Sequence, residues 1–458
     1  MIGDLKPYAG YKESGLPWLG LVPERWCVER TKWQFRHQKK LNADGKQTNI
    51  LSLTLRGVVN NNPDDPEGLV PKDYRTYQLF AKGDLVFKLI DLENLRTSRV
   101  GLVHEDGIMS SAYVRLVPSS LTNMRYFFHQ FYDLYARGIY NQLGAGVRST
   151  LSSSDLLNVG IAIPPPGEQA AIARFLDWAN GRLERAILAK RKAITLLNEQ
   201  KQAIIHRAVT RGLDQSVPMK PTGIPWISDI PAHWSLLPNR ALLRIRKVLV
   251  GERHTRYQLL SLTKRGVIVR DLSELRGKFS ADMGTSQEVR SGDLVFCLFD
   301  VPETPRTIGL SSNDGMITGA YTVMECADPE MAKFLELFYI AMDDRKLLSP
   351  IYSGVRNTIP KDRFLGAKTP IPPASERAAI QAAVQNETAI PIQTIMRLER
   401  EIELLREYRT RLVADVVTGK LDVREAAARL PEEVPQDTVE SDADLGEDLD
   451  MADEEATA

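Results

Sequence analysis

The sequence has few of the residues from which disulfide frameworks, zinc sites and membrane spans are built. Its 458 residues include three cysteines, Cys27, Cys297 and Cys326, which are far apart and form no CxxC pair. We therefore expect free thiols in a reducing compartment, with neither a disulfide nor a structural zinc site. No run approaches the roughly 18 apolar residues of a membrane span, and the N-terminus has no apolar run typical of a signal peptide. We predict a cytoplasmic protein that has no contact with a membrane.

Motifs of enzymes that act on DNA or nucleotides are also missing. There is no glycine-rich loop ending in Lys-Ser or Lys-Thr, so ATP hydrolysis by this chain is not supported. The proline-rich segments read Ile-Pro-Pro-Pro and Ile-Pro-Pro-Ala, and lack the Asn/Asp-Pro-Pro-aromatic sequence of amino-methyltransferases. The six histidines show no metal-ligand spacing. We predict a chain with no catalytic residues, no metal site and no cofactor of its own.

The formal net charge is zero, but acidic residues are concentrated at the C-terminal end. Residues 431–458 hold twelve Asp and Glu and no Lys or Arg, which leaves the first 430 residues with a net charge of +12. A segment of this composition is typical of disordered chain. A basic body favours an anionic partner such as nucleic acid, although it does not require one.

What the sequence does contain is a second copy of itself, at an offset of 208 or 209 residues. The matching segments include 14–26 with 222–234, 51–59 with 260–268, 83–87 with 292–296, and the Gly-Val-Arg triplets 146–148 with 354–356. A repeat of this length is too long for a solenoid unit. It predicts two similar modules, and a partner that also has two similar parts.

Each copy has the same order of elements. Its opening combines Trp with Pro, which we interpret as a clamp of the chain onto the domain, with base stacking as the alternative. Short β-rich runs follow at 50–54, 84–90 and 112–117, and at 259–263, 293–299 and 320–324. An amphipathic helix comes next; Asp328-Pro329 should cap the second one. The helical face expected in the core of the first copy is Met124, Phe127, Phe128, Phe131, Leu134 and Tyr135.

A helix of about forty residues follows the proline-rich segment of each copy. Apolar residues step along both helices by four and three, the spacing of a coiled-coil seam: Leu183, Ile187, Ile194, Leu197 and Ile204 in the first, and Ile395, Leu398, Ile402, Leu405 and Leu412 in the second. We expect interruptions at Asn180-Gly181 and at Pro391. Because neither helix can bury its seam alone, we predict an α+β fold in which two similar globular α/β domains are joined and separated by two long antiparallel helices, with a pseudo-twofold internal repeat.

These motifs, twice and in the same order, resemble the specificity (S) subunit of a type I restriction–modification system. The resemblance covers roughly residues 11–422. It implies two target-recognition domains, each reading half of a split DNA site, and spacer helices that hold them apart and dock methyltransferase subunits. Carried over by position, it gives an N-terminal lead-in at 1–13, a first recognition domain at 14–166, a central spacer helix region at 167–214, a second recognition domain at 215–374, a distal spacer helix region at 375–423 and an acidic disordered tail at 424–458.

The partners implied by this resemblance are double-stranded DNA with a split asymmetric site, two methyltransferase subunits and, through the complex, restriction subunits. Adenine methylation and ATP-dependent cleavage, with S-adenosylmethionine, ATP and Mg, would then belong to those subunits. The alternative is a duplicated coiled-coil adaptor that binds only proteins. A helix over 182–210 would be about 43 Å long, close to the roughly 34–36 Å of one DNA turn, so the spacer is expected to act as a ruler.

The repeat also sorts candidate DNA contacts. Residues that are identical in both copies cannot distinguish two half-sites, so we assign them to the phosphate backbone: Arg56, Arg148, Arg265 and Arg356. A turn glycine beside an arginine that pairs with a carboxylate at the core edge remains an equal alternative. Residues in segments that differ between the copies are candidates for base readout, although an unconstrained loop would also differ: Asn60, Asn61, Lys88, Arg96, Arg99, Arg270 and Arg306.

Overall fold

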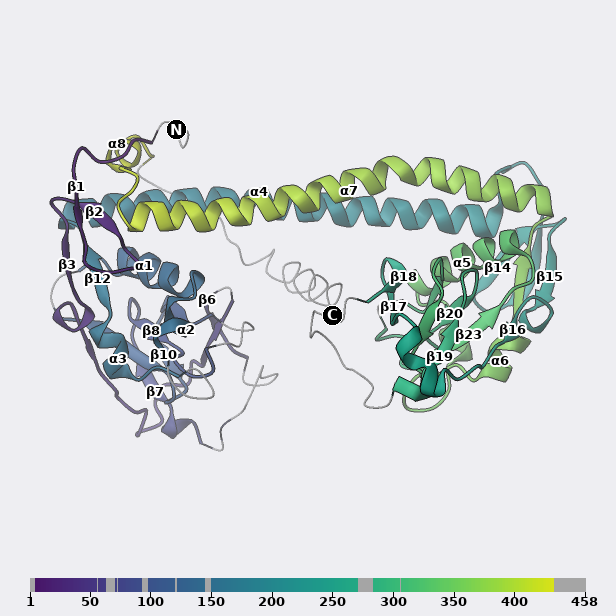
Figure 1. The fold of residues 1–458 in the computed structure, drawn as a ribbon, viewed down its shortest axis with the longest axis horizontal. Helices are drawn as coiled ribbons and strands as arrows, with labels where there is room; N and C mark the ends of the chain where they lie inside the picture. Colours follow the sequence, from purple (N-terminus) through teal and green to yellow (C-terminus); the bar gives the residue numbers. More distant parts are fainter. Residues whose placement is uncertain are drawn as a thin grey trace. The chain divides into compact units, whose positions relative to one another are not determined.

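The chain divides into two compact units in the computed structural model (Figure 1). The structure describes residues 5–431 except 56, 63–70, 72, 93–97, 120–121, 145–149, 271–282 and 305. Among these residues, unit 1 comprises 5–187 with 401–431, and unit 2 comprises 188–400. Each unit contains one globular part and a segment of both long helices.

The globular part of unit 1 consists of short antiparallel strands arranged around one four-stranded sheet. Its central sheet has the order β4-β11-β8-β9, and the remaining strands pair as β1-β2, β3-β12, β5-β6 and β7-β10. The strands are β1 (Tyr11–Glu13), β2 (Leu21–Pro23), β3 (Cys27–Arg30), β4 (Phe35–His37), β5 (Leu51–Thr54), β6 (Gly57–Asn60), β7 (Gln78–Phe80), β8 (Leu85–Phe87), β9 (Val100–Leu102), β10 (Gly107–Met109), β11 (Val114–Pro118) and β12 (Gly160–Ile163). The helices are α1 (Met124–Ala136), α2 (Ile139–Leu143) and α3 (Ser153–Asn158).

Unit 2 repeats this arrangement strand by strand. Its central sheet has the order β16-β23-β20-β21, and the other pairs are β13-β14, β15-β24, β17-β18 and β19-β22. The strands are β13 (Met219–Ile224), β14 (Ile227–Pro231), β15 (Ser235–Pro238), β16 (Arg244–Ile245), β17 (Leu260–Thr263), β18 (Gly266–Val269), β19 (Gln287–Val289), β20 (Leu294–Phe296), β21 (Ile308–Leu310), β22 (Gly315–Ile317), β23 (Thr322–Glu325) and β24 (Lys368–Ile371). The helices are α5 (Pro329–Asp344) and α6 (Lys361–Gly366). The internal repeat predicted from the sequence is therefore a repeat of fold.

Each central sheet packs against the amphipathic helix that follows it. In unit 1, Phe127 and Phe131 of α1 are fully buried and meet Phe35 edge to face, with ring centroids 5.0 and 5.9 Å away. Aromatic pairs of this geometry add to the free energy gained by burying their area. Helix α5 begins as predicted, with the Asp328 carboxylate accepting hydrogen bonds from the backbone of Glu330 and Met331. The aromatic face predicted for α1 is thus confirmed as core.

A β-hairpin lies over the second face of each sheet and depends on a glycine. A Cβ on Gly101 would lie 2.6 Å from a Leu53 methyl, and one on Gly309 would lie 2.7 Å from a Leu262 methyl. Only glycine allows this close approach of β5-β6 onto β9, and of β17-β18 onto β21. In unit 2 this hairpin carries the turn Arg265-Gly266-Val267, so Gly309 helps to fix where that turn lies.

Both long helices run without a break, which makes the predicted interruptions wrong. Helix α4 spans Pro166–Arg211 and α7 spans Ala374–Val417, with Pro391 inside the helix. An interior glycine costs about 1 kcal/mol and an interior proline about 3 kcal/mol, amounts that packing along so long a helix can offset. Pro391 is itself buried, so its ring adds contacts where its missing N–H removes one hydrogen bond. Glycines with positive φ, Gly212 and Gly419, follow the two helix ends.

The two helices lie side by side and antiparallel within each unit (Figure 1). In unit 1, Glu184 near the start of α4 pairs with Arg409 near the end of α7, at 2.8 Å. In unit 2, Arg207 near the end of α4 pairs with Glu387 near the start of α7, at 3.0 Å. All ten seam residues named above are buried or half-buried. In the part of the chain that the structure covers, no helix is long and apolar enough to cross a bilayer.

Candidate DNA interface and the clamps that hold it

The opening tryptophan of each unit is fastened to the start of the long helix. The Trp26 indole donates to Glu168 and the Trp234 indole donates to Glu376, both at 3.0 Å. Both rings are at most 1% exposed. The interpretation of these segments as clamps is therefore confirmed, and base stacking by these two rings is excluded because no face of either ring is free.

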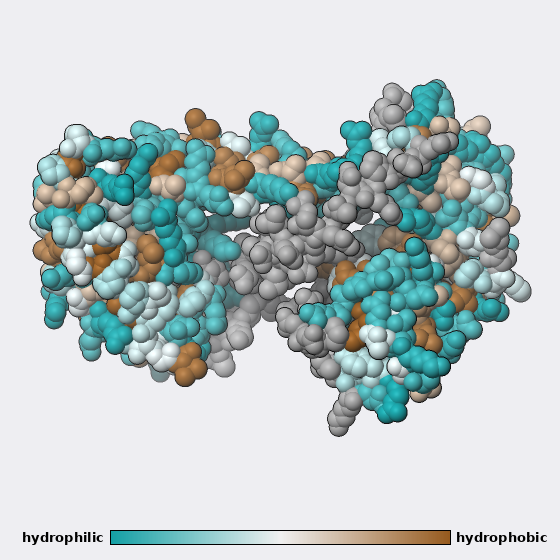
Figure 2. Space-filling model, turned by 180° about the vertical axis from the view of Figure 1, so that it is seen from behind, coloured by the Kyte–Doolittle hydropathy of each residue, from teal (hydrophilic) through white to brown (hydrophobic). Residues whose placement is uncertain are grey.

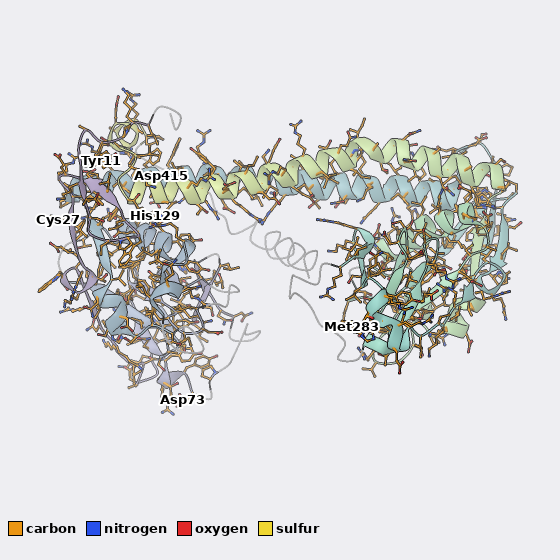
Figure 3. All side chains as sticks on the ribbon, viewed as in Figure 1. Tyr11, Cys27, Asp73, His129, Met283 and Asp415 are labelled. Atoms are coloured by element: carbon orange, nitrogen blue, oxygen red, sulfur yellow. The ribbon has the colours of Figure 1, made fainter. Side chains whose placement is uncertain are left out.

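The clamp of unit 1 has more partners than the clamp of unit 2. The Glu168 carboxylate also accepts a hydrogen bond from the Tyr8 hydroxyl and forms an ion pair with Arg25 at 2.7 Å. Burial and the hydrogen bond to Glu168 raise the pKa of Tyr8 far above its usual value, so the phenol stays protonated and donates. In unit 2, the second partner of the Glu376 carboxylate is the His233 ring, whose Nε2 lies 2.7 Å away. In unit 1 the lead-in segment is also fixed to the end of α7, where the Tyr11 hydroxyl donates to the Lys420 carbonyl at 3.1 Å (Figure 3).

In unit 2 the Gly-Val-Arg segment forms the tip of a small hairpin that rests on the loop between β20 and β21. Ser353 and Thr358 exchange backbone hydrogen bonds of 2.8 and 3.0 Å, and Val355 at the tip is 102% exposed. The loop is joined to the hairpin by backbone hydrogen bonds from Ile359 to Leu298 and from Asp300 to Arg356. The structure thus brings together two segments that the sequence assigned to phosphate contact and to base readout.

Arg356 is already paired in the structure. Its guanidinium forms a two-point ion pair with Asp300, including Nε to Oδ1 at 3.0 Å, and this hydrogen-bonded pair raises the pKa of Arg356. Asp300 has a φ of 46°, and Asp91 at the equivalent position of unit 1 has a φ of 57°. This backbone region is uncommon for residues other than glycine. Arg356 therefore matches the alternative of an arginine held by a carboxylate, and a phosphate would have to replace Asp300.

Two of the base-readout candidates are built into the fold. Arg306 pairs with Asp344 at 2.8 Å, and the two side chains are 15% and 14% exposed. Arg99 is completely buried and donates to the Asp91 carbonyl. Lys88 is half-buried, and burial followed by the charge of Arg99 lowers its pKa. In this conformation the guanidiniums of Arg99 and Arg306 stabilise the loops and do not extend from them.

The remaining candidates lie nearer to solvent. Asn60 is exposed at the end of β6, where His104 contacts its Oδ1 at 2.9 Å, and Asn61 donates to Ser52 at 3.0 Å. Arg265 is exposed at the β17-β18 turn. Burial raises the pKa of Tyr321, and the charge of the nearby Arg270, which is half-buried, offsets part of that rise. The candidates Arg56, Arg96 and Arg148 and the acidic tail from 432 onward lie outside the described residues.

Asp91 and Asp300 were not among the residues predicted from the sequence. The signal was present, because both are Asp at equivalent positions of loops that differ at most other positions. Identical residues inside divergent segments suggest a structural role that both copies share. Here that role is to hold an unusual backbone turn and, in unit 2, to fix Arg356.

Replacing Arg306 with Ala should lower the free energy of unfolding by about 2–3 kcal/mol, because Asp344 would remain buried without its main cation. Urea unfolding followed by fluorescence would measure the loss. The exposed Arg265→Ala provides the control and should change stability by less than about 0.5 kcal/mol. An equally small effect for Arg306→Ala would show that its pair with Asp344 contributes nothing to the fold.

Comparison with known proteins gives a family for the first copy. Residues 56–192 match the model of the type I restriction modification DNA specificity domain. A chain from a structural study of the assembly and conformational transition of a type I restriction–modification system is similar in fold, with a TM-score of 0.58 and 12% identity, and with 87% of this chain and 99% of that chain covered. No curated protein matches the sequence.

Two further solved chains show weaker likeness. The HsdS subunit of Thermoanaerobacter tengcongensis has a TM-score of 0.39 and 14% identity, with 87% of this chain and 98% of that chain covered. The type I S subunit of M. genitalium has a TM-score of 0.34 and 13% identity, with coverage of 86% and 96%.

Residues 56–192 therefore belong to the family of type I restriction modification DNA specificity domains, and the resemblance predicted from the sequence is confirmed. Beyond this range, the solved chain with the TM-score of 0.58 shows a likeness of fold that covers 87% of this chain.

Proposed function

We propose that this chain is the non-catalytic DNA-recognition subunit of a type I restriction–modification enzyme in the cytoplasm. Each unit reads one half of a split site in double-stranded DNA. The long helices dock two methyltransferase subunits, and restriction subunits join through these. Adenine methylation and ATP-dependent cleavage, with S-adenosylmethionine, ATP and Mg, belong to the partner subunits.

The observation that carries this proposal is a repeated scaffold with different loops. The loop after the central strand is fixed in the same way in both units, by the hydrogen bonds Leu151 to Leu89 and Ile359 to Leu298, of 2.9 and 2.7 Å. The loops differ in length and composition, with Lys88 where the other copy has Cys297. Two half-sites of different sequence require this combination, because the scaffold sets position and the loops supply different contacts.

The test uses the full chain with its methyltransferase subunit. Methylated adenines would first be mapped in DNA exposed to the complex, and binding would then be measured on duplexes with both half-sites, one half-site or neither. Tight binding is expected only with both half-sites at fixed spacing. Assembly with methyltransferase but equal affinity for all three duplexes would favour the protein-only adaptor.

Arg356 and Asp300 give a paired prediction for DNA affinity. Arg356→Ala should weaken binding to every sequence and lower the slope of log K against log salt by about one, as expected for one lost phosphate contact. Asp300→Asn should strengthen binding, because it removes the anion that competes with phosphate, while Asn tolerates the left-handed backbone. Salt titrations of both variants would decide; an unchanged slope in Arg356→Ala would remove it from the backbone contacts.

A further inference from the structure

Unit 2 has an open pocket where the end of α4 meets the first turns of α7. The pocket has a volume of about 270 Å³ and is lined by Ala208 and Leu213 on one side and by Ala383 and Val384 on the other. The pair between Arg207 and Glu387 lies at its rim, with both side chains about half exposed. Leu213 is 44% exposed, so apolar surface faces solvent here.

The internal repeat shows what the equivalent surface of unit 1 looks like. By position, Ala383 corresponds to Phe175, Val384 to Leu176 and Ala208 to Val416. These three residues of unit 1 are larger than their counterparts, and all three are 0% exposed. Because equivalent positions on a helix face the same way, the Phe175 ring fills in unit 1 the space that is open beside Ala383 in unit 2.

The cover of this surface in unit 1 is helix α8 (Arg424–Ala428) with its flanks. Val423, Ala426 and Ala427 are buried in the same apolar cluster as Phe175 and Val416, and Leu430 is also buried. Arg174 of α4 donates to the carbonyls of Leu430 and Pro431 at 2.5 and 2.8 Å, which fixes the end of the segment. Among the described residues of unit 2 no helix follows α4 at this point, because the chain continues from α4 into β13.

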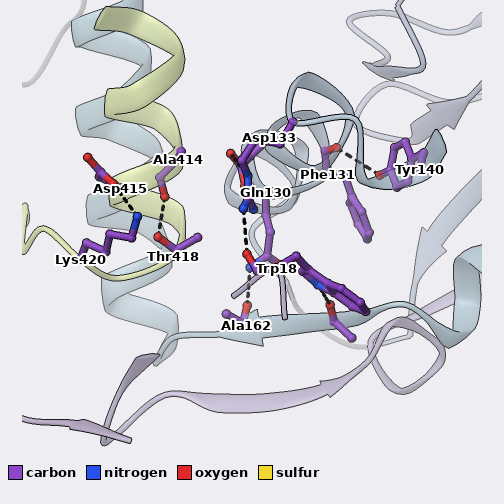
Figure 4. Close-up of polar contacts among 12 residues, drawn as sticks. Trp18, Gln130, Phe131, Asp133, Tyr140, Ala162, Ala414, Asp415, Thr418 and Lys420 are labelled. Carbon is purple, nitrogen blue, oxygen red and sulfur yellow. Dashed lines mark hydrogen bonds and ion pairs between the residues drawn. The ribbon is translucent and has the colours of Figure 1, made fainter. Parts of the chain in front are cut away.

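The two surfaces also differ in their charged residues, because unit 1 lacks the ion pair that lies at the rim of the pocket in unit 2. Asp415, the equivalent of Arg207, pairs with Lys420 at its own helix end, at 3.0 Å (Figure 4). Ala179, the equivalent of Glu387, is fully buried. One turn further along, Arg182 of unit 1 lies over the Trp178 ring, whereas its equivalent in unit 2 is Ile390, which is 73% exposed.

Beyond the ion pair at the rim of the pocket, apolar surface resumes along α7 at Ile390. Ile390 follows Glu387 at a spacing of three, and Glu387 follows Ala383 at four, so the three residues lie on one face of the helix. Apolar side chains are visible among hydrophilic ones on the helical layer in Figure 2. A surface of this kind is typical of a protein interaction site.

We propose that this pocket docks an apolar helix of the methyltransferase subunit, and that α8 seals the equivalent surface of unit 1. The docked helix resembles α8, with a face of Ala, Val and Leu, and it adds a large apolar side chain in the space that Phe175 fills in unit 1. The inference rests on the proposed function, since that function supplies the partner. The two methyltransferase subunits are then not equivalent, because only one of them finds the pocket open.

Unit 1 supplies the substitutions for a test. In Ala383→Phe with Ile390→Arg, the unit 1 residues replace those of unit 2, so the pocket is filled and its apolar extension is removed. The control is Ala382→Phe with Met396→Arg, at exposed positions of the same helix that do not line the pocket. Binding of the purified methyltransferase subunit to the full chain would be measured by titration calorimetry and native mass spectrometry, without DNA.

The pocket variant should lose at least about tenfold in affinity for the first methyltransferase subunit, with the control within about twofold of the unaltered chain. Equal binding by the variant and the unaltered chain would overturn the inference and leave the proposed function standing. Failure of the unaltered chain to bind methyltransferase at all would instead reject the proposed function. If the pocket variant binds methyltransferase normally but no longer binds DNA, the pocket is a DNA contact and the inference is overturned.

A second variant tests the seal. Ala426→Asp with Ala427→Asp places charges in the buried face of α8 and should release it. Binding of the second methyltransferase subunit should then tighten at least about tenfold, while α4 and α7 keep their helical circular-dichroism signal. Limited proteolysis would show whether α8 has been released. If it has, and the affinity for the second methyltransferase subunit is unchanged, α8 does not seal the surface of unit 1.

Discussion

Inserting four residues after Ile194 should lengthen the preferred gap between the two DNA half-sites by one or two base pairs. Four residues add about 6 Å to an α-helix, and a base-pair step rises about 3.4 Å. The half-site sequences should not change, because both globular parts are untouched. Affinity for the original site should fall roughly tenfold to hundredfold, since both half-sites can no longer be contacted in register.

The insertion also disturbs the seam, so a matched variant is needed. Seven inserted residues preserve the heptad pattern, add about 10 Å and should lengthen the gap by about three base pairs. Selection of split sites from a library of random spacers would measure both shifts. If both variants still select the original gap at full affinity, α4 does not set the distance between the two sites of DNA contact.

The sequence predicted those parts of the fold that depend on periodicity and on repetition. Step sizes of four and three placed the seam residues on the two long helices, and the paired segments predicted two similar globular parts. The sequence did not show that α4 and α7 continue through Gly181 and Pro391. Local propensity opposes a helix at both places, and the packing that outweighs it is made by residues far away in the chain.

The candidate site was less predictable, for a physical reason. Arginine in a variable loop suits both base readout and ion pairing, and the sequence does not reveal which acids will fold beside it. The partner of Arg306 is Asp344, 38 residues away at the end of α5. The partner of Arg356 is Asp300, 56 residues away. Both arginines are held by acids from another segment, so only the three-dimensional structure separates a cation that is available from one that is already paired.

Removal of the Glu168 carboxylate should have the largest effect on stability. Glu168→Ala leaves the indole N–H of Trp26 and the hydroxyl of Tyr8 without their acceptor, and Arg25 without its anion. The Glu168 side chain is only 3% exposed, so water cannot replace it easily. Breaking a buried ion pair costs about 3–5 kcal/mol, and because Arg25 is 43% exposed we expect about 3 kcal/mol.

The loss should be confined to unit 1, because Glu168 binds the lead-in segment and the opening of that unit alone. Hydrogen exchange resolved by peptide would therefore show faster opening of 5–30 and of the first turns of α4, with 215–370 unchanged.

Glu376→Ala is the matched variant in unit 2. It should cost about 1–2 kcal/mol, because the Glu376 side chain is 23% exposed and has fewer partners. Glu168→Gln should fall between, since an amide oxygen can still accept from Trp26 but carries no charge for Arg25. Equal losses for Glu168→Ala and Glu376→Ala would show that the indole contact alone fastens each domain to its helix, and that Tyr8 and Arg25 add nothing.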